Sequence, residues 1–228
     1  MAGGKFAGGT GTELDPFLIE DAHDFNAIRL YSNGYHFQII KDINMNTPPY
    51  NTGTGWQPIS HFNSKIDGQG HKVTGLRIWS KGDDVGLFLR SSENVSITNA
   101  HFDDLYFELV TEETGDKVFT FLGVSLSEAF TGYFLSGCSI IGKFKIEAPN
   151  ANVTSRLFSR SVLAGSKAEA KSYYRDCYFE LENLGSEQIN IFGHYGRSSG
   201  CVNDLYVYKC LLKLKGDFRE YSTSGSIT

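Results

Sequence analysis

The stretch Phe62–Ile78, FNSKIDGQGHKVTGLRI, decides the predicted fold. Residues 64–66 and 72–78 are short segments with the apolar spacing that is typical of β-strands. The connection at residues 67–71, DGQGH, holds two glycines, which can adopt the positive φ angles of a tight corner at little steric cost. Gly75, inside the second segment, indicates a bend or a close backbone approach. The stretch therefore predicts two short strands that meet at a sharp turn.

This arrangement resembles the GLUG-type repeats of bacterial and phage surface proteins. In those repeats a tryptophan and a Pro-Ile pair precede a short strand, an Asp-Gly-x-Gly-His turn and a Gly-Leu strand. The resemblance implies a right-handed parallel β-helix, the fold of pectate lyases and of many phage tailspikes, and structural roles for the turn residues. It covers residues 5–110 well and residues 118–216 as a degenerate repeat. The matching residues are Trp56, Pro58-Ile59, Asp67-Gly68, Gly70-His71 and Gly75-Leu76.

The composition of the 228 residues is that of a folded, acidic chain. Hydrophobic residues make up 40%, enough for a core, and 25 glycines against 5 prolines suit many tight corners. Aromatic residues reach 14% and favour strands over helices. The net charge of −5 lacks the basic character of nucleic-acid-binding proteins, and no apolar run has the length of a membrane span. We therefore expect no nucleic-acid partner and no membrane insertion.

The chain divides into three predicted parts. Residues 1–14 are glycine-rich and predict a flexible arm, whereas residues 15–216 predict the β-helix domain. Within that domain, residues 20–31 predict a helix that caps the N-terminal end of the β-structure, with Asp21 as its N-cap. Residues 217–228 are polar and predict a tail that continues into a partner or docks on one.

Four later segments share one pattern: an apolar residue, two variable residues, a small residue, a variable residue and a second apolar residue. Their starts lie 38, 39 and 33 residues apart (135 − 97, 174 − 135 and 207 − 174), and another apolar strand precedes each. Such spacing predicts stacked coils with loops that bulge out between strands, about six coils in all. The segments are Ile97–Phe102, Leu135–Ile140, Tyr174–Phe179 and Val207–Leu212.

The repeat places Cys138, Cys177 and Cys210 at the small position, which Ala100 occupies one coil earlier. We expect these side chains to form one inward-facing line with free thiols. The chain has no CxxC spacing, and parallel side chains on stacked strands fit the disulfide dihedral poorly. A structural role in the core is therefore predicted for these cysteines, rather than a disulfide framework or a zinc site.

Polysaccharide-cleaving β-helices use converging carboxylates as acid, base or nucleophile. Acidic residues that are adjacent in sequence, such as Asp103-Asp104, point to opposite faces of a strand and do not converge. The repeat instead aligns Glu108 with Lys145 and Glu180 with Lys213 on the outer surface, as pairs worth about 0.2–1 kcal/mol each. We therefore expect a chain without catalytic residues, metal ions or cofactors.

Aromatic side chains at repeat edges and loop tips are the candidate sugar-binding residues. Residues 46–55 contain two prolines and two glycines and predict a projecting loop with Tyr50 at its tip. Trp79 and Tyr173 lie near repeat edges, whereas the repeat position of Tyr174 points inward. Tyr50, Trp79 and Tyr173 are therefore the predicted ligand contacts.

The combined expectation is a bacteriophage virion protein, such as a tail fibre, tailspike or baseplate appendage. It implies a rigid, non-catalytic module that binds other virion proteins or a host-surface polysaccharide. A surplus of Phe and Tyr over what six coils can bury predicts self-association, most simply as a trimer. The first 30 residues show no secretory signal, which favours a virion over the alternative, a bacterial cell-surface adhesin. A polysaccharide lyase or glycoside hydrolase on the same fold is the second alternative.

Overall fold

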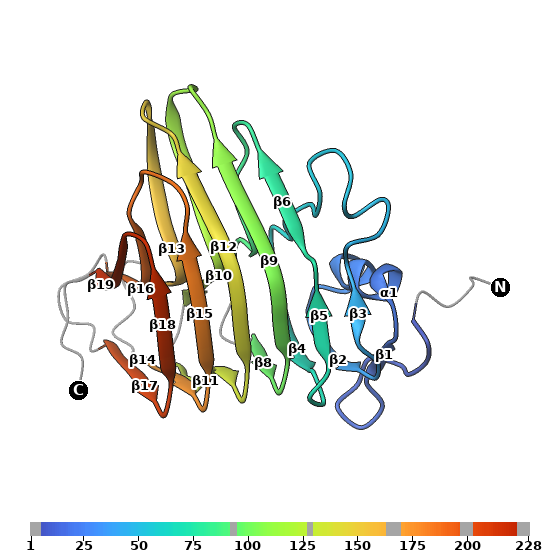
Figure 1. Cartoon of the computed structure of the whole chain (residues 1–228). Coiled ribbons are helices and arrows are strands. Elements are labelled where there is room, and N and C mark those ends of the chain that lie inside the picture. The colour runs from blue at the N-terminus through green and yellow to red at the C-terminus, as the bar shows by residue number, and fades with distance from the viewer. Residues whose placement is uncertain (1–5, 92–94, 127–129, 163–169, 197–202, 223–228) are drawn as a thin grey trace.

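The structure is a computed structural model that describes residues 6–91, 95–126, 130–162, 170–196 and 203–222. This part of the chain is all-β apart from one short helical segment. Its strands form three sheets, here called the first, second and third sheets, and every pairing of named strands is parallel. The helical segment lies at one end of the molecule, and the last strands lie at the other (Figure 1).

Each sheet collects strands from along the whole chain. The first sheet contains, in spatial order, β1 (Phe17–Ile19), β2 (Asn33–Ile39), β4 (Asn63–Asp67), β8 (Ser96–Thr98), β11 (Phe130–Ser136), β14 (Ala170–Arg175) and β17 (Asn203–Tyr208). The second contains β3 (Ile43–Asn44), β5 (Lys72–Thr74), β9 (His101–Val110), β12 (Ser139–Glu147), β15 (Tyr178–Asn183) and β18 (Leu211–Lys215), and β6 (Arg77–Ser80) also pairs with β9. The third contains β7 (Val85–Phe88), β10 (Gly115–Leu126), β13 (Ala151–Val162), β16 (Ile189–Gly196) and β19 (Phe218–Ser222).

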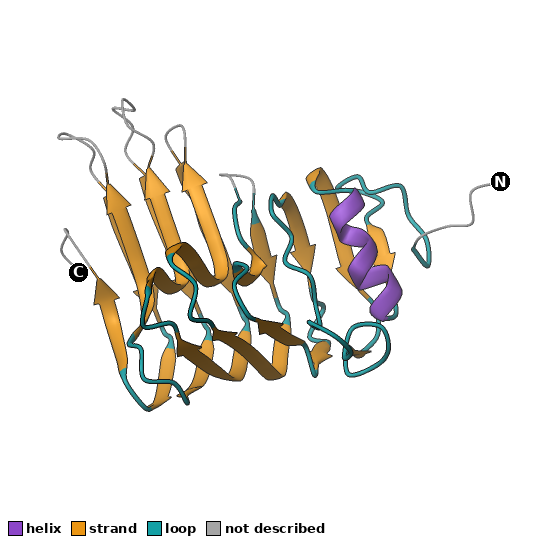
Figure 2. Ribbon diagram, turned by 90° about the horizontal axis from the view of Figure 1, so that it is seen from above, coloured by secondary structure: helices purple, strands orange, loops and turns teal. Residues whose placement is uncertain are grey.

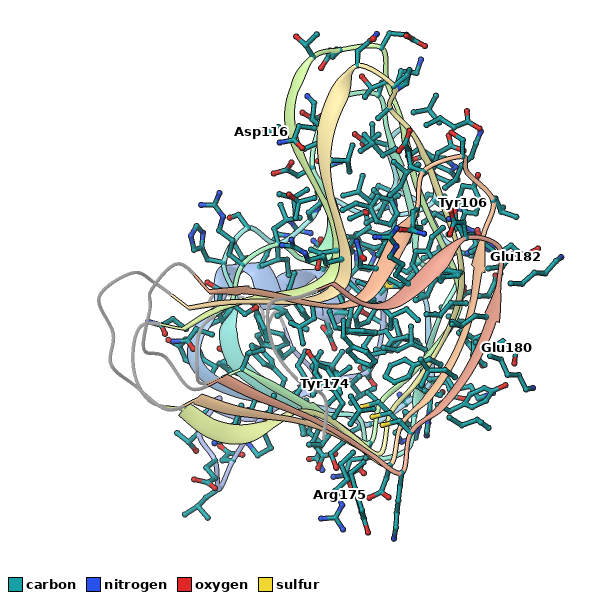
Figure 3. All side chains as sticks on the ribbon, turned by 90° about the vertical axis from the view of Figure 1, so that its left-hand side faces the viewer. Tyr106, Asp116, Tyr174, Arg175, Glu180 and Glu182 are labelled. Carbon is teal, nitrogen blue, oxygen red and sulfur yellow. The ribbon has the colours of Figure 1, made fainter. Side chains whose placement is uncertain are left out.

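From β4 onward the chain visits these sheets in a fixed order: first, second, third, then first again. In the described residues it completes five such circuits, β4–β7, β8–β10, β11–β13, β14–β16 and β17–β19. Before them, β1 and β2 belong to the first sheet and β3 to the second. The sequence predicted about six coils. Because each strand lies beside its equivalents in the neighbouring circuits, side chains stack into rows, and the inward rows fill the space between the sheets (Figure 3).

The register predicted from the repeat is confirmed. In the first sheet Ile97 pairs with Leu135, Leu135 with Tyr174, and Tyr174 with Val207. Tyr174 is 1% exposed and points into the core, as its repeat position predicted (Figure 3). In the second sheet one row contains Phe102, Ile140, Phe179 and Leu212.

The corner between the first and second sheets keeps one conformation in the last four circuits. Two residues separate the strands there, and the first of them has a positive φ between 50° and 65°. The second is the small buried or half-buried residue of the repeat. The positive-φ residues are Asn99, Gly137, Asp176 and Lys209.

The first turn, at residues 67–71, differs from the prediction at one glycine. Gln69 (φ +51°) and Gly70 (φ +82°) adopt the left-handed conformation, but Gly68 does not. Glycine is required at position 68 for space instead, because a Cβ atom there would lie 2.4 Å from the Cα of Ala100. Gly68 thus lies against the first member of the small-residue line.

The remaining turn residues make structural contacts. The Asp67 side chain accepts a hydrogen bond of 3.0 Å from the backbone N–H two residues on, which closes the turn. The Nδ1 atom of His71 lies 3.2 Å from Oδ1 of Asp42. Gly75 has φ +72° and separates β5 from β6, so the strand predicted over residues 72–78 is two strands.

Helix α1 (Ala22–Ala27) continues into a 3-10 turn, η1 (Ile28–Leu30), and lies at the N-terminal end of the sheets (Figure 2). Asp21 is its N-cap, and its side chain accepts hydrogen bonds from two backbone N–H groups of the first turn. The side chain of Phe25 is fully buried, with its ring centroid 5.4 Å from that of Trp56. The helical segment is slightly shorter than predicted and packs over the first circuits.

The prediction of a flexible arm over residues 1–14 is wrong for its described part. The ring of Phe6 stacks on Phe17 with centroids 4.5 Å apart. Gly9 has φ +83°, and a Cβ atom there would lie 1.8 Å from the carbonyl oxygen of Pro16. The glycines of this segment therefore permit close packing against the first strand.

The domain boundary predicted at residue 216 falls short of the last strand. β19 pairs in parallel with β16, with Ile189 opposite Phe218, and Phe218 packs against the core. The predicted tail 217–228 therefore begins inside the third sheet, and residues 223–228 lie outside the described part.

A ridge projects where the chain passes from the second sheet to the third, near Asp116 (Figure 3). β10 and β13 begin at Gly115 and Ala151, so the connections that precede them are short, at residues 111–114 and 148–150. Long strands form there because apolar side chains meet between β9, β10 and β12. The buried ones are Phe107, Leu109, Phe119, Phe144 and Ile146.

Candidate functional site

The outer surface of the second sheet is the candidate functional site, and we call it the charged face. Its charged outward side chains change sign from strand to strand: acidic on β9, basic on β12 apart from Glu147 at its end, acidic on β15 and basic on β18. Glu180 and Glu182 point away from the core on this surface (Figure 3). The charged face comprises Asp103, Asp104, Glu108, Lys143, Lys145, Glu180, Glu182, Lys213 and Lys215.

Both cross-strand pairs predicted from the repeat are confirmed. Glu108 lies opposite Lys145, with Oε2 and Nζ 3.8 Å apart. Glu180 lies opposite Lys213 at 3.5 Å. The two pairs follow from strand alternation, because residues flanked by inward apolar positions must point outward.

Glu182 is a central residue that the sequence analysis missed. Its carboxylate lies 3.5 Å from Nζ of Lys143 on one side and 2.5 Å from Nζ of Lys215 on the other. The Glu182 side chain is 21% exposed, whereas that of Lys215, with one such partner, is 80% exposed. The repeat alignment, extended by two residues, would have found this set.

The charged face is hollowed over Gly142 into an open groove of about 570 Å³. A bulge in β9 places Asp103 and Asp104 opposite Ile141 alone, and Asp104 has φ +52°. Gly142 lies in the inward row of β12, in register with the buried Leu105 and Leu181, and a Cβ atom there would lie 2.7 Å from the Cβ of Leu105. The glycine therefore leaves room for Leu105 on the inner side of the sheet, and the depression on the outer side lies beside the bulge, bordered by ionic groups of both signs.

The carboxylates of β15 are held in their ionised form. A hydrogen bond from the Tyr178 hydroxyl lowers the pKa of Glu180. A hydrogen bond from the Lys215 ammonium lowers the pKa of Glu182. A general acid needs a pKa close to the working pH, so a lowered pKa suits ion pairing rather than proton donation at neutral pH.

Tyr106 lies on the same face, opposite Lys143 in the register. Its hydroxyl donates a hydrogen bond of 2.6 Å to Oε2 of Glu108. Burial, followed by this hydrogen bond, raises the pKa of Tyr106 to about 12. The phenol is therefore neutral and serves as a fixed donor to the Glu108 carboxylate.

Of the three predicted ligand-contact aromatics, Tyr50 and Trp79 have described side chains, and these two do not form one site. The prediction for Tyr50 is wrong: it is 8% exposed, and its hydroxyl lies 2.9 Å from Nδ1 of His23, because the loop folds back onto the helix. Trp79 is half-buried on β6, opposite Glu108 in the register, at the edge of the charged face. The Tyr173 side chain lies outside the described part of the structure.

The cysteines line the corner between the first and second sheets. Cys138 and Cys177 are buried, Cys210 is partly exposed in the last circuit, and all three thiols are free. A hydrogen bond with the Cys138 thiol raises the pKa of Cys177 to about 12, so this thiol stays protonated. The line continues the position that Ala100 occupies, fully buried, one circuit earlier.

Thiol labelling checks this arrangement. In the native protein we expect Cys210 to react faster than Cys138 and Cys177, because its side chain is the most accessible of the three. Under denaturing, non-reducing conditions all four cysteines of the chain should react. A missing pair of thiols in the denatured protein would show a disulfide and contradict the arrangement.

In the described ranges, no three His, Cys, Asp or Glu side chains lie together in a way that could hold a metal ion. No described helix combines the length and apolar composition needed to cross a bilayer. The expectations of no metal and no cofactor stay predictions.

Comparison with known proteins finds partial relatives. No protein-family model matches the chain. A candidate Gly-rich membrane protein of Evansella cellulosilytica is 39% identical over 100 residues, which are 41% of this chain and 12% of that protein. Halomucin of Haloquadratum walsbyi is 32% identical over 98 residues, which are 40% of this chain and 1% of that protein. The match thus spans a small part of each relative.

One solved structure is similar in outline. It is a candidate immunoglobulin A1 protease from Bacteroides ovatus, with a TM-score of 0.40 and 16% sequence identity. The alignment covers 99% of this chain and 84% of that chain. A likeness at this level assigns neither a fold nor an activity.

Proposed function

We propose that the chain is a right-handed parallel β-helix that serves as a rigid, non-catalytic attachment module in a larger surface assembly. The observation that carries this proposal is the fixed order in which the chain visits three parallel sheets, with apolar rows inside and paired charges outside. Crossovers between parallel strands are right-handed in about 98% of cases, which supports the handedness. A module of this kind is stiff because each circuit is hydrogen-bonded to its neighbours.

The charges on the outer surface support a non-catalytic role. Glycoside hydrolysis requires one carboxyl group with a raised pKa beside an ionised one. On the charged face, Glu180 and Glu182 have lowered pKa values and bind lysines of the next circuit. Asp24 has a pKa raised by burial, but it lies in the cap and accepts a hydrogen bond from the Glu20 backbone. We therefore assign these carboxyl groups structural roles: Glu180 and Glu182 help to set the register of the strands, and Asp24 helps the helical cap to pack.

The biological setting that we propose is a bacteriophage virion, as part of a tail fibre, tailspike or baseplate appendage. This setting rests on the resemblance of the first turn to repeats of phage surface proteins. The second candidate is a bacterial cell-surface adhesin, which the name of the Evansella relative, a Gly-rich membrane protein, favours. Antibodies against the chain, applied to purified particles and to intact cells, distinguish the two settings by which surface is labelled.

Incubation with host capsule or wall polysaccharide tests the non-catalytic claim. We expect the polymer length to stay constant on size-exclusion chromatography, while the polymer is retained on immobilised protein. Trp79→Ala should weaken retention, because Trp79 is the predicted aromatic contact that lies partly exposed beside the charged face. Tyr50→Phe is the matched control with unchanged retention. A fall in polymer length would refute the proposal.

Self-association is a separate expectation. Light scattering on the purified chain should give a mass above the 25.3 kDa of one copy, and a trimer is the assembly expected from the sequence. No described Phe is among the exposed large apolar residues, so a surplus of exposed Phe does not support this expectation. A mass that equals one copy at all concentrations tested would contradict it.

A further inference from the structure

The last strand of the second sheet, β18, leaves the alternation of charge incomplete. In the described residues β18 ends its sheet, and it is a basic strand, with Lys213 and Lys215 pointing outward. Each lysine has a glutamate partner on the β15 side, at 3.5 Å and 2.5 Å. The Lys215 side chain is 80% exposed, compared with 59% and 27% for Lys143 and Lys145 on the inner strand β12, and Lys213 is 59% exposed.

Glu182 shows how an inner position of the same face is completed. It has lysines on both sides, Lys143 and Lys215, and is 21% exposed. Along one row of paired residues, Lys143, Glu182 and Lys215, the charge alternates from strand to strand, which predicts an acidic residue beside Lys215 on a further strand. In the neighbouring row Lys213 follows Glu180, so the same further strand would place an acidic residue beside Lys213.

The inward rows end at the same edge. Phe179 and Leu181 on β15 are 0% and 2% exposed, because β12 and β18 cover them on both sides. On β18 the equivalent residues are Leu212, which is partly exposed, and Leu214, which is 37% exposed. An exposed strand edge with uncovered apolar rows is a template for a further strand.

We propose that the β18 edge binds a parallel β-strand of a partner in which apolar and acidic residues alternate. The pattern required is the one that β15 itself presents to β12 and β18, Phe179-Glu180-Leu181-Glu182. This inference rests on the proposed function, because it names the chemistry of the partner of that module. The apolar residues cover Leu212 and Leu214, and the carboxylates bind Lys213 and Lys215.

A second copy of the chain that pairs its own β18 with this edge fits poorly. Such pairing places Lys213 and Lys215 of one copy beside the same lysines of the other, and like charges directly opposite each other on paired strands are destabilising. The charge complementarity therefore selects an acidic strand over a copy of β18.

A tethered probe tests the proposal. The full chain is extended at Thr228 by a flexible Gly/Ser linker of about 15 residues and a copy of Tyr178–Asn183, YFELEN. The matched control has YFKLKN in its place. We expect the acidic probe to slow amide hydrogen exchange at Leu211–Lys215 about tenfold, while the lysine probe leaves it unchanged.

Charge removal provides the second arm. In the Lys213→Gln/Lys215→Gln chain, which puts no like charges opposite Glu180 and Glu182, the preference should be lost, so that the two probes slow exchange equally. In the parent chain, equal protection by both probes, or protection by neither, overturns the proposal. Protection of β18 in the unextended chain that rises with protein concentration would identify a second copy as the occupant. If the chain cleaved polysaccharide, the proposed non-catalytic function would be wrong, but the outcome of the probe experiment would still decide whether β18 binds an acidic strand.

Discussion

Replacement of Phe25 by alanine should lower the free energy of unfolding by about 3–5 kcal/mol, the range for deleting a fully buried aromatic ring that leaves a cavity. Phe25 is 0% exposed and packs on Trp56, which is itself 1% exposed and also lies under the guanidinium of Arg29. The cavity would open at the junction of the cap and the first circuits. Chemical denaturation followed by circular dichroism measures the change.

Leu30→Ala is the matched control for this experiment. Leu30 belongs to the same helical segment but is 59% exposed, so its truncation should change stability by less than about 0.5 kcal/mol. If Phe25→Ala unfolded at the same denaturant concentration as the parent, the helix would not stabilise the end of the sheets and would not act as a cap.

Cys177→Asp should destabilise the chain by several kcal/mol at neutral pH, because it buries a carboxylate in the middle of the small-residue line. Cys177 is 3% exposed, and its thiol donates a hydrogen bond of 3.2 Å to the backbone carbonyl of Arg175. Burial would raise the folded-state pKa of the new carboxyl above its unfolded value of about 3.9. The folded state then binds more protons in this range, so the penalty grows as pH rises through it and shrinks as pH falls.

Two control variants separate the effect of a buried charge from the effect of a changed side-chain size at this corner. Cys177→Ala removes only the sulfur and should cost about 1–2 kcal/mol without pH dependence. Lys209→Asp places the same carboxylate at an exposed corner position whose φ of +50° matches the +52° of Asp176 one circuit earlier. It should change stability by about 0.5 kcal/mol or less. An equal loss for Cys177→Asp and Lys209→Asp would show that the line is not buried.

The repeat could be predicted from the sequence because three observables agree within it. Apolar spacing, a small residue at one position and alternating charge are together enough to predict the pairings of Ile97 with Leu135 and of Glu108 with Lys145. Strand alternation converts such spacing directly into an inside and an outside. The N-cap at Asp21 could also be predicted from the sequence, because its side chain accepts hydrogen bonds from backbone N–H groups two and three residues later.

The features that could not be predicted depend on contacts between segments that are distant in sequence. Tyr50 is buried because a loop folds back onto His23, 27 residues away, and loop composition carries no signal for that. Residues 6–14 were predicted to be flexible because glycine permits many conformations, whereas Gly9 allows a close approach to Pro16. The groove over Gly142 lies beside a bulge in the neighbouring strand. A bulge adds only one residue to a strand, and the spacing of apolar residues in the sequence does not reveal it.

The corner between the first and second sheets also limits how the sequence of such a chain can change during evolution. From β8 onward this corner always has two residues, 99–100, 137–138, 176–177 and 209–210, and the second packs into the line of small side chains. The connections from the second sheet to the third differ in length, with residues 111–114, 148–150, 184–188 and 216–217. Insertions and deletions should therefore accumulate in the connections from the second sheet to the third, where they do not disturb the stacking of one circuit on the next. The chain can therefore acquire new outer loops, while the corner keeps the register between circuits unchanged.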